Sequence, residues 1–474
     1  MAMRRFNRLF ILISIIVFSL TIIIRAESPK STPYGDPHAV RGGQLNLHTS
    51  AFPKSFNGFT TASADTMAVF GLVYDTLLEI HPVTLEYEPL IAKTWNISDD
   101  KKVFTFTIDP RAKWADGKPI TAADVKFTYD VIMNPQNLTS VMRLYYGRIK
   151  EPEIINQYTI KFTAKTIHFK NLEALAGLNI IPKHLFEGKD FNKSFNMSLP
   201  AGSGPYILSE VKEGRYFVLT RRKNYWADQL PQHRGMYNFE KIKFKVMDQN
   251  VAFEAFKKGE FDIYDEITPK RWVTETNIER FQKNWIVKQK IFNYSPQGFL
   301  GLAINMRRPL FKDIRVRQAL CHLFDRKTLI AKMRYNESRP LLSYWPSLYS
   351  NQENANQMID YNPVKAKELL QEAGFTRLDK DGYLIDKTGK RFEFTILHYS
   401  DNWEKYLTPY VESCKQVGIK VNLELLSWAT FQKKMEEYSF DVAVAGWTGQ
   451  LFDDPEQLWY SKHADEIGGT NYPG

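Results

Sequence analysis

Cysteine is scarce in this chain of 474 residues, which contains only Cys321 and Cys414. In an exported protein two such thiols can form a disulfide, and the alternative is a pair of buried free thiols. The sequence gives no distance between them, so both arrangements stay open. No cysteine lies near Ala26, the expected end of a leader, and this excludes a lipid-anchored N-terminus.

The motifs of common catalytic and metal sites are absent as well. The sequence contains no H-E-x-x-H, G-x-S-x-G, C-x-x-C, G-x-x-x-x-G-K-[ST] or G-x-G-x-x-G. No two of the nine histidines lie within four residues of each other, so a helical histidine pair for zinc is excluded. We therefore expect that the protein is not an enzyme and that it binds no cofactor and no metal. The alternative is a secreted hydrolase acting on peptides or glycans, because Asp and Glu are common enough to supply a carboxylate pair.

Runs of basic residues are also lacking, although the chain carries a formal net charge of +10. Four of its basic residues and none of its acidic residues lie in the first 26 positions, so the remainder carries +6. A mild excess of charge without clustering does not support binding to nucleic acid.

The first 26 residues are typical of a secretory signal peptide. Arg4, Arg5 and Arg8 form a charged start, Leu9 to Ile24 is apolar and uncharged, and Ala26 suits the last residue before cleavage. We expect the mature protein to begin at Glu27 and to be periplasmic. The alternative is an uncleaved membrane anchor, since the apolar run is long and Ile24 is bulky for its position.

The composition is that of a globular protein able to bury a core, with 43% hydrophobic and 24% charged residues. The length suits about three domain-sized units. The 10 Trp, 24 Tyr and 32 Phe residues will mostly be core, and an excess of Trp and Tyr also suits cavities for amphipathic ligands.

The stretch from Gly298 to Ile330 organises the chain. Residues 299–305 are short and apolar, which predicts a buried strand. Val316, Ala319 and Leu320 then recur at helical spacing, and the carboxylate of Asp313 is placed to cap that helix.

A second informative block lies between Leu90 and Phe127. Residues 103–108 alternate as a strand, Asp116-Gly117 predicts a turn, and Thr121 with Asp124 three residues later predicts a capping box.

Several motifs resemble those of the extracellular solute-binding proteins of family 5, the oligopeptide/dipeptide type. They are I-N-x-x-x-P-x-F-x-D-x-R-V-R-Q-A-L from Ile304, A-K-W-x-D-G-x-P-x-T-A-x-D-V-x-F from Ala112, G-S-G-P-Y from Gly202 and E-A-F-x-x-G-E-F-D from Glu254. The resemblance covers Gly42 to Gly474.

The resemblance implies an α/β fold, that of a two-lobed periplasmic binding protein of type II, cluster C, with an accessory subdomain in the first lobe. We expect a signal peptide over 1–26, the first lobe over 27–63 and 196–296, the accessory subdomain over 64–195 and the second lobe over 297–474. The family continues with a further helix and strand beyond the position of Gly474, so we expect a C-terminal segment to be missing.

Asn238-Phe239-Glu240, Arg271-Trp272 and residues 469–472 are similar to the branch linked to uptake of peptides and microcin C. The resemblance implies capture of an oligopeptide or peptide-like solute and its delivery to an inner-membrane ABC permease with ATPase subunits. Two lobes would close on the ligand about a hinge near residues 295–305, and the protein would act as a monomer.

The candidate ligand-contacting residues lie in loops at strand ends, which often line a cleft. Trp428 and Trp447 match pocket tryptophans of the family, with core packing as the alternative. Gly446 leaves its backbone free to approach a ligand. Arg271 and Trp272 would clamp a carboxylate and offer a stacking face, unless Arg271 is a solvated surface charge. The remaining candidates are Asn57, Tyr294 and Asn305.

One position departs from the family. An aspartate that pairs with the N-terminal ammonium of the peptide is replaced by Gln450, which cannot neutralise that charge. Asp453 or Asp454 would replace the missing carboxylate, or the ligand would present no free ammonium there. We favour the second, which predicts that acetylating the N-terminus of a peptide leaves its affinity nearly unchanged. In a third interpretation Asp453 caps the next helix.

Overall fold

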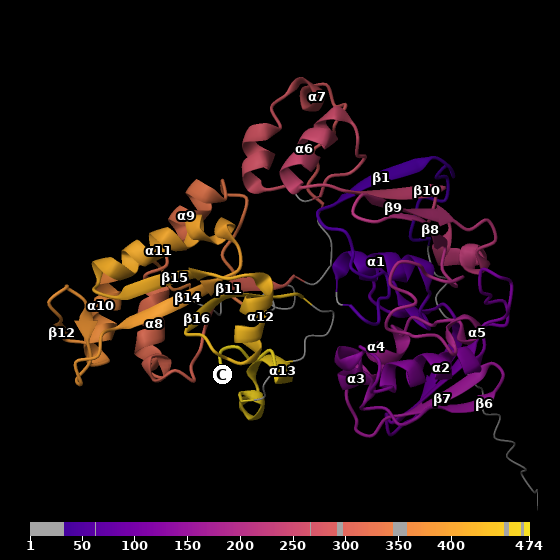
Figure 1. Ribbon diagram of the computed structural model, residues 1–474, viewed down its shortest axis with the longest axis horizontal. Coiled ribbons are helices and arrows are strands. Elements are labelled where there is room, and N and C mark those ends of the chain that lie inside the picture. Colours follow the sequence, from indigo (N-terminus) through magenta and orange to yellow (C-terminus); the bar gives the residue numbers. More distant parts are fainter. Residues whose placement is uncertain are drawn as a thin grey trace, which may run out of the picture.

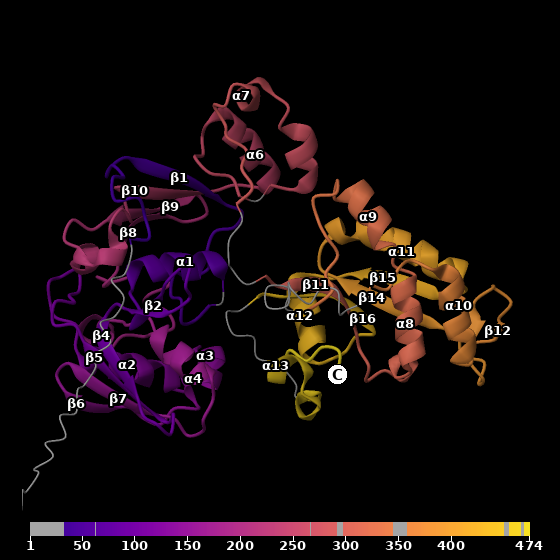
Figure 2. The ribbon, with the colours of Figure 1, turned by 180° about the vertical axis from the view of Figure 1, so that it is seen from behind.

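The computed structural model describes residues 33–61, 63–265, 267–291, 297–344, 358–449, 455–465 and 469–474. They form two bodies that stand side by side, each built on its own sheet (Figure 1). We call the body that contains residues 33–291 the first lobe and the body that contains residues 297–474 the second lobe. The view from behind shows the same separation (Figure 2).

The first lobe is built on a mixed four-stranded sheet. Its order is β1 (Gln44–Thr49), β10 (Lys241–Val246), β9 (Tyr216–Arg221) and β8 (Tyr206–Lys212). β1 and β10 are parallel, and the other neighbours are antiparallel. β1 and β10 are separated by almost two hundred residues in the chain, yet they are neighbours in this sheet.

A second, antiparallel sheet is formed by residues that come between β1 and β8 in the chain. Its order is β4 (Ala92–Ile97), β5 (Val103–Ile108), β7 (Thr159–Thr163) and β6 (Glu153–Asn156). A small ribbon pairs β2 (Leu78–Ile80) with β3 (Tyr87–Pro89). The helices around these strands are α1 (Ala64–Val73), α2 (Ala122–Met133), α3 (Ser140–Tyr146), α4 (Lys170–Ala176) and α5 (Lys183–Phe186).

Local sequence signals account for several of these elements. Thr121 and Asp124 form the expected capping box at the start of α2. The turn at residues 202–206 brings the backbone of Gly204 against α1, where its amide donates to the carbonyl of Val73 at 2.8 Å. A side chain on Gly202 or Gly204 would collide with the backbone of that helix, so the glycines of the G-S-G-P-Y motif are required by close approach. Arg222 fastens the turn by donating to three of its carbonyls.

One hydrophobic core runs through both sheets of the first lobe. It includes Phe56 and Val73, Phe106 and Trp114 of the inserted block, and Phe217 of β9. The division between first lobe and accessory subdomain therefore does not coincide with a gap in packing, and the boundaries near residues 63 and 196 stay a prediction.

A short helical segment completes the first lobe. It contains α6 (Gln249–Lys258), the π-helical turn η3 (Arg271–Glu275) and α7 (Glu279–Gln282). Asp248 caps α6, and Gly259, with φ of 87°, ends it. Two 3₁₀ turns, η1 (Trp226–Gln229) and η2 (Pro231–His233), precede this segment.

The second lobe has a mixed sheet in the order β11 (Phe299–Ile304), β16 (Val442–Trp447), β14 (Glu393–His398) and β15 (Lys420–Leu425). Its helices are α8 (Ile314–His322), α9 (Arg326–Met333), α10 (Pro363–Glu372), α11 (Glu404–Gln416), α12 (Trp428–Glu436) and α13 (Pro455–Trp459). The smaller elements are β12 (Arg377–Leu378), β13 (Leu384–Ile385) and the 3₁₀ turns η4 (Pro309–Phe311), η6 (Asp401–Trp403) and η7 (Ser461–His463).

Two details differ from, or decide between, the expectations. The strand at residues 299–304 is an edge strand and not a buried one, because β11 has β16 on one side only and Leu300 is 53% exposed. The α8 helix does begin at Asp313, whose side chain accepts from the amide of Arg315. Cys321 and Cys414 are free thiols. Burial raises the pKa of Cys414 to about 12, so this thiol is unreactive.

Candidate ligand site between the lobes

The end of β16 offers a main-chain edge. β14 pairs with β16 only at Ile396–Val442 and Leu397–Ala443, whereas β11 accompanies β16 as far as Trp447. From Val444 onward β16 therefore continues past its pairing with β14. Gly446 is exposed on this stretch. Val444 and Ala445 are buried, so the accessible part of this edge lies at Gly446, where backbone groups can bind an extended chain as an added strand.

Trp447 ends β16 within a group of aromatic rings. Its ring stacks on Phe299 at 4.7 Å and 23°, and Tyr472 lies 5.6 Å away. Phe299 also contacts Tyr344, which contacts Trp459. The indole N–H groups of Trp447 and Trp459 are buried and find no acceptor in the part of the chain that the structure describes.

Trp428 is the first residue of α12 and is 55% exposed. Its ring is parallel to Phe431 at 5.8 Å and meets the edge of Tyr399 at 4.9 Å. Tyr399 in turn lies 6.3 Å from Trp403. We call these four residues the Trp428 cluster. Both ribbon views place α12 and α13 on the side of the second lobe that faces the first (Figures 1 and 2).

The backbone at Gly298 passes close to the backbone at the end of β16. A Cβ atom on Gly298 would lie 2.0 Å from the carbonyl oxygen of Trp447, so only glycine allows the chain entering the second lobe to pass the end of β16. At Gly446 an added Cβ would lie 3.1 Å from the side chain of Leu300.

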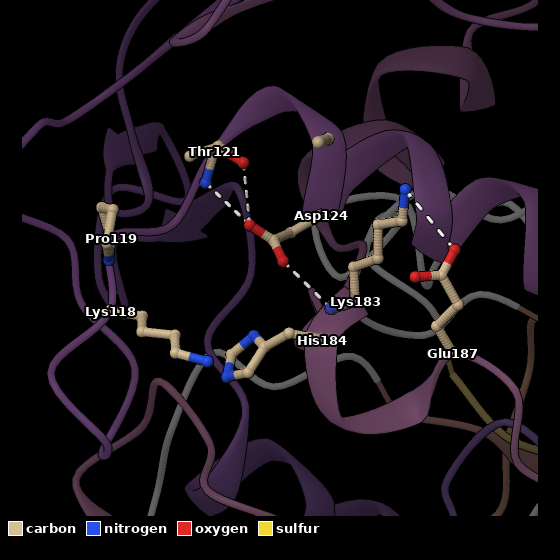
Figure 3. Close-up of a pocket in the computed structure, with 8 residues that line it drawn as sticks. Lys118, Pro119, Thr121, Asp124, Lys183, His184 and Glu187 are labelled. Atoms are coloured by element: carbon tan, nitrogen blue, oxygen red, sulfur yellow. Dashed lines mark hydrogen bonds and ion pairs between the residues drawn. The ribbon is translucent and has the colours of Figure 1, made fainter.

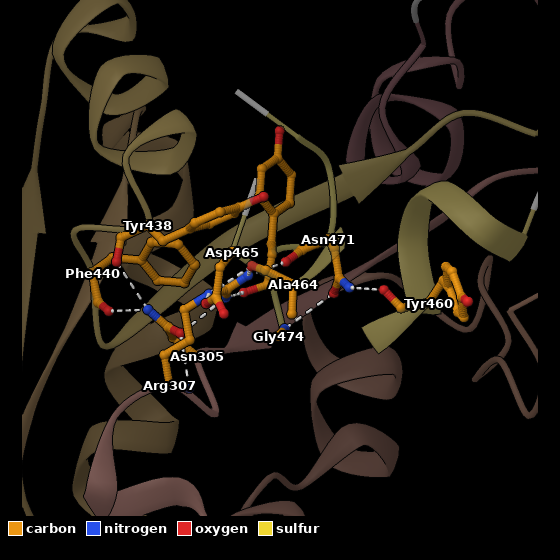
Figure 4. A network of polar contacts seen from close by, with 10 residues as sticks. Asn305, Arg307, Tyr438, Phe440, Tyr460, Ala464, Asp465, Asn471 and Gly474 are labelled. Atoms are coloured by element: carbon orange, nitrogen blue, oxygen red, sulfur yellow. Dashed lines mark hydrogen bonds and ion pairs between the residues drawn. The ribbon is translucent and has the colours of Figure 1, made fainter. Parts of the chain in front are cut away.

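Arg307, which sequence reasoning did not single out, ties the last described segment to the second lobe (Figure 4). Its guanidinium donates to the carbonyls of Ala464, Asn471 and Tyr472 and lies 3.6 Å from the ring of Tyr438. The result is that Tyr472 is held against Trp447. In the sequence Arg307 is the first arginine of M-R-R-P. The carbonyls and the tyrosine ring that it contacts lie more than 130 residues away, so the local sequence does not reveal them.

Arg271 is neither a solvated charge nor free to clamp a carboxylate. It is 9% exposed and donates to Gln249, Asn250 and Tyr264, with Glu275 within 3.5 Å. The guanidinium therefore organises the helical segment around it. The face of Trp272 is covered in part by Lys288, whose ammonium lies 4.4 Å from the ring centre.

Asn57 and Asn305 are fully enclosed by protein. Asn57 donates to the carbonyl of Phe191 and accepts from the amide of Phe59, and Asn305 donates to the carbonyls of Tyr438 and Phe440. Both amides fix loops, so we do not retain them as ligand contacts. The buried position could not be read from either residue type, because loop asparagines are usually exposed.

Tyr294, Gln450, Asp453 and Asp454 lie outside the described residues. The expectations that rest on them, including the substitution of the aspartate by Gln450, stay predictions.

A depression on the accessory part of the first lobe can be set aside as a ligand site (Figure 3). It is lined by Lys118, Pro119, Thr121, Ala123, Asp124, Lys183, His184 and Glu187. Asp124 accepts from the backbone of Thr121 and of Lys183, and the ammonium of Lys183 pairs with Glu187. His184 is paired with Asp116. Asp124, Lys183, His184 and Glu187 are thus occupied by structural contacts, and α5 lies on the side away from the second lobe (Figure 1).

The described residues contain no group of three or more His, Cys, Asp or Glu side chains arranged to hold a metal ion. Among the same residues, no helix combines the length and the apolar character required to span a bilayer.

Comparison with known proteins identifies the family. The family model described as "Bacterial extracellular solute-binding proteins, family 5 Middle" matches residues 86–469. A Brucella melitensis protein named only as a binding protein is 30% identical, over 93% of this chain and 79% of its own length. A protein of Agrobacterium fabrum named as a probable peptide-binding protein, YejA, is 28% identical, over 93% of this chain and 78% of its own.

Solved structures share the two-lobed fold. The oligopeptide-binding protein AppA from Bacillus subtilis, in complex with a nonapeptide, superposes with a TM-score of 0.72 at 25% identity, covering 92% of this chain and 84% of AppA. NikA from Brucella suis, in complex with Fe(III)-EDTA, gives 0.74 at 23% identity, covering 91% and 84%. Both the resemblance seen in the motifs and the expected fold class are confirmed, and the chain belongs to the bacterial extracellular solute-binding proteins of family 5.

Proposed function

We propose that this solute-binding protein captures an extended oligopeptide or peptide-like solute between its lobes and delivers it to an inner-membrane ABC permease. The observation that carries the proposal is the exposed main chain at Gly446, where β16 extends beyond its pairing with β14. An added strand bonded through its backbone accounts for binding of peptides with many different side chains.

Aromatic surfaces flank that edge. Trp428 stands at one side with its cluster, and Trp447 stands at the end of the strand beside Phe299. Side chains of a bound peptide would lie in the spaces between these rings, where water can fill what a small side chain leaves empty. We assign Trp428, Gly446 and Trp447 as ligand contacts. We expect Gln450 and Asp453, which follow Trp447 in the sequence, to contact the ligand as well.

The ligands of related proteins support a peptide ligand without requiring one. AppA holds a nonapeptide, and DppA from Helicobacter pylori holds the peptide STSA. Other proteins of the same fold hold Ni(L-His), Fe(III)-EDTA or mannohexaose. The fold alone therefore does not choose the ligand. The unpaired edge of β16 favours a peptide over a chelate or a sugar, because only a peptide offers matching backbone donors and acceptors.

Location and partners follow from the same proposal. A chain with the N-terminal pattern of residues 1–26 would be exported, cleaved near Glu27 and released into the periplasm as a monomer. There it would meet the permease and, through it, the ATPase subunits. The alternative of a secreted hydrolase makes a different prediction, since a hydrolase consumes its peptide and a carrier returns it.

The experiment is mass spectrometry of solutes released by denaturing the freshly purified protein. We expect intact oligopeptides in amounts close to that of the protein. Recovery of sugars or metal chelates in place of peptides would contradict the proposal. A peptide that is added and then recovered as fragments would support the hydrolase.

A further inference from the structure

A pocket of about 430 Å³ lies where the two lobes approach each other. In both ribbon views α6 and α7 form the part of the first lobe that reaches toward α9 and α11 (Figures 1 and 2). The pocket is lined from the first lobe by Gln249, Asn250, Thr268, Lys270, Arg271 and Glu275, and from the second by Asn402, Trp403, Lys405 and Tyr406.

The charges of this pocket do not balance. Three cations and one carboxylate line it. Glu275 and Arg271 lie within 3.5 Å of each other, and Arg271 is further held by Asn250 and Tyr264. Lys270 and Lys405 are exposed, and neither forms an ion pair with any carboxylate in the described part of the chain.

The two lysines belong to different lobes. Moving the lobes together brings their ammonium groups closer and raises their mutual repulsion, which is stronger at a partly enclosed site than in water. An anion between them reverses the sign of that interaction. The pocket also contains the amides of Asn250 and Asn402 and the hydroxyl of Thr268, which suit the oxygen atoms of a carboxylate.

Aromatic ring contacts connect one wall of this pocket to the proposed peptide site. Trp403 lines the pocket, and the ring of Trp403 contacts Tyr399, which contacts Trp428. A chain bound beside Trp428 can therefore extend along these aromatic rings toward the two lysines.

We propose that Lys270 and Lys405 bind a carboxylate of the ligand from opposite sides of the pocket, so that a carboxylate-bearing peptide closes the lobes better than a neutral one. This inference rests on the proposed peptide function and adds the chemical class of one end of the ligand. The carboxylate comes from the C-terminus of the peptide or from an acidic side chain, and the test separates these sources.

The test uses the full-chain protein and pools of pentapeptides built from uncharged residues. One pool carries free C-terminal carboxylates and the other carries C-terminal amides. Both compete in equal amounts for limiting protein, and mass spectrometry counts the peptides retained. We expect the acids to exceed the amides about 10-fold, the lower end of what a charge-assisted hydrogen bond contributes.

Variants locate the effect. Lys270→Gln and Lys405→Gln should each bring the ratio toward equal retention, whereas Lys270→Arg and Lys405→Arg should keep it. Lys283→Gln and Lys433→Gln are matched controls, because their ammonium groups are exposed and already pair with Glu279 and Glu437, four residues away in each case. The controls should leave the ratio unchanged.

A third pair of pools separates the two sources of the carboxylate. Both carry C-terminal amides, and one has an internal Glu where the other has Gln. Preference for the Glu pool, lost in the same two Gln variants, assigns the carboxylate to a side chain.

Three results would overturn the inference. Equal retention of acids, amides and Glu peptides by the unmodified protein removes the anion site but leaves peptide binding intact. A preference that survives in both Gln variants places the carboxylate elsewhere. Retention of no peptide at all overturns the proposed function itself, so the two failures are distinguishable.

Discussion

Trp428 exposes more than half of its side chain although tryptophan is costly to leave in water, and its neighbours stack beneath it. We expect Trp428→Ala to weaken peptide binding by about 1–2 kcal/mol, or roughly 5- to 30-fold, because an exposed aromatic ring that becomes covered by ligand is a typical hot spot. Calorimetric titration with a peptide recovered from the protein measures this.

Trp285→Ala is the matched control for that variant. Trp285 is 64% exposed, and it follows α7 on the first lobe, apart from the end of β16. Its loss should leave affinity unchanged. Equal affinity of the Trp428→Ala and unmodified proteins would remove Trp428 from the site.

Asp75 is buried beside Tyr225 and Trp226, which both donate to its carboxylate. Burial raises its pKa from 3.8 to about 6, although these hydrogen bonds oppose the rise. Because the folded-state pKa lies above the unfolded value, this group stabilises the fold fully below about pH 4, and the contribution is lost as the pH rises through 6.

We therefore expect the free energy of unfolding of the first lobe to increase as the pH falls from 7 to 5, by about 1–1.5 kcal/mol from Asp75. The increase should shrink in Asp75→Asn, measured by urea unfolding at each pH. Part of it should persist, because Glu79 raises the pKa of His233 despite burial and acts in the same direction. A pH dependence identical in both proteins would contradict this assignment.

The roles of single residues were harder to predict from the sequence than the secondary structure or the fold. Asn57 and Arg271 were predicted as ligand contacts because they follow strands of the first lobe, yet their side chains form loop and helix contacts inside that lobe. Their roles depend on partners such as Phe191, more than 130 positions from Asn57, which no local pattern reveals. Trp428 and Gly446 lie where a ligand could reach them, because helix starts and strand ends expose what local patterns place there.

At the scale of elements, α2 and α6 follow directly from local chemistry. The capping box at Thr121 and the left-handed Gly259 are decided by a few adjacent residues, so the sequence predicts them. The sequence-based prediction of a buried strand at residues 299–305 was wrong, because β11 lies at the edge of its sheet. An apolar run such as residues 299–304 is compatible with either place, and the choice depends on strands far along the chain.

Arg307 connects elements that are distant in sequence, and its removal should loosen them together. We expect Arg307→Ala to lower the free energy of unfolding of the second lobe by about 2–3 kcal/mol, since a largely buried charge-assisted network is lost. Urea unfolding followed by tryptophan fluorescence measures this, because Trp447 packs against Tyr472 of the released segment.

Arg308→Ala is the adjacent control. Its guanidinium is more exposed and donates to the single carbonyl of Phe440, with Asp441 at 3.4 Å. We expect a loss of about 1 kcal/mol or less. An Arg307→Ala protein no less stable than Arg308→Ala would show that the segment 469–474 is held by other contacts.

For the whole molecule, closure should make the particle more compact. If the lobes hinge near residues 295–305, small-angle X-ray scattering should give a smaller radius of gyration with saturating peptide than without. The Trp428→Ala protein at the same peptide concentration should remain nearer the open form. An unchanged profile of the unmodified protein at saturation would indicate a rigid molecule.

Export is tested on the native protein. N-terminal sequencing of the periplasmic fraction should begin at or near Glu27, because the pattern of residues 1–26 suits cleavage after Ala26. Recovery of intact Met1 from washed membranes would favour the anchor instead.

The two lobes have separate hydrophobic cores: the main core of the first lobe ends at Ile242, and the cores of the second lobe begin at Ala303. Without ligand each lobe therefore holds its own melting temperature, and differential scanning calorimetry should resolve two heat-absorption peaks. A ligand that touches both lobes stabilises only the state in which both are folded, and this couples their melting by mass action. The bound ligand thus has the effect that a shared hydrophobic core has in other proteins, because it makes the two lobes unfold as one cooperative unit.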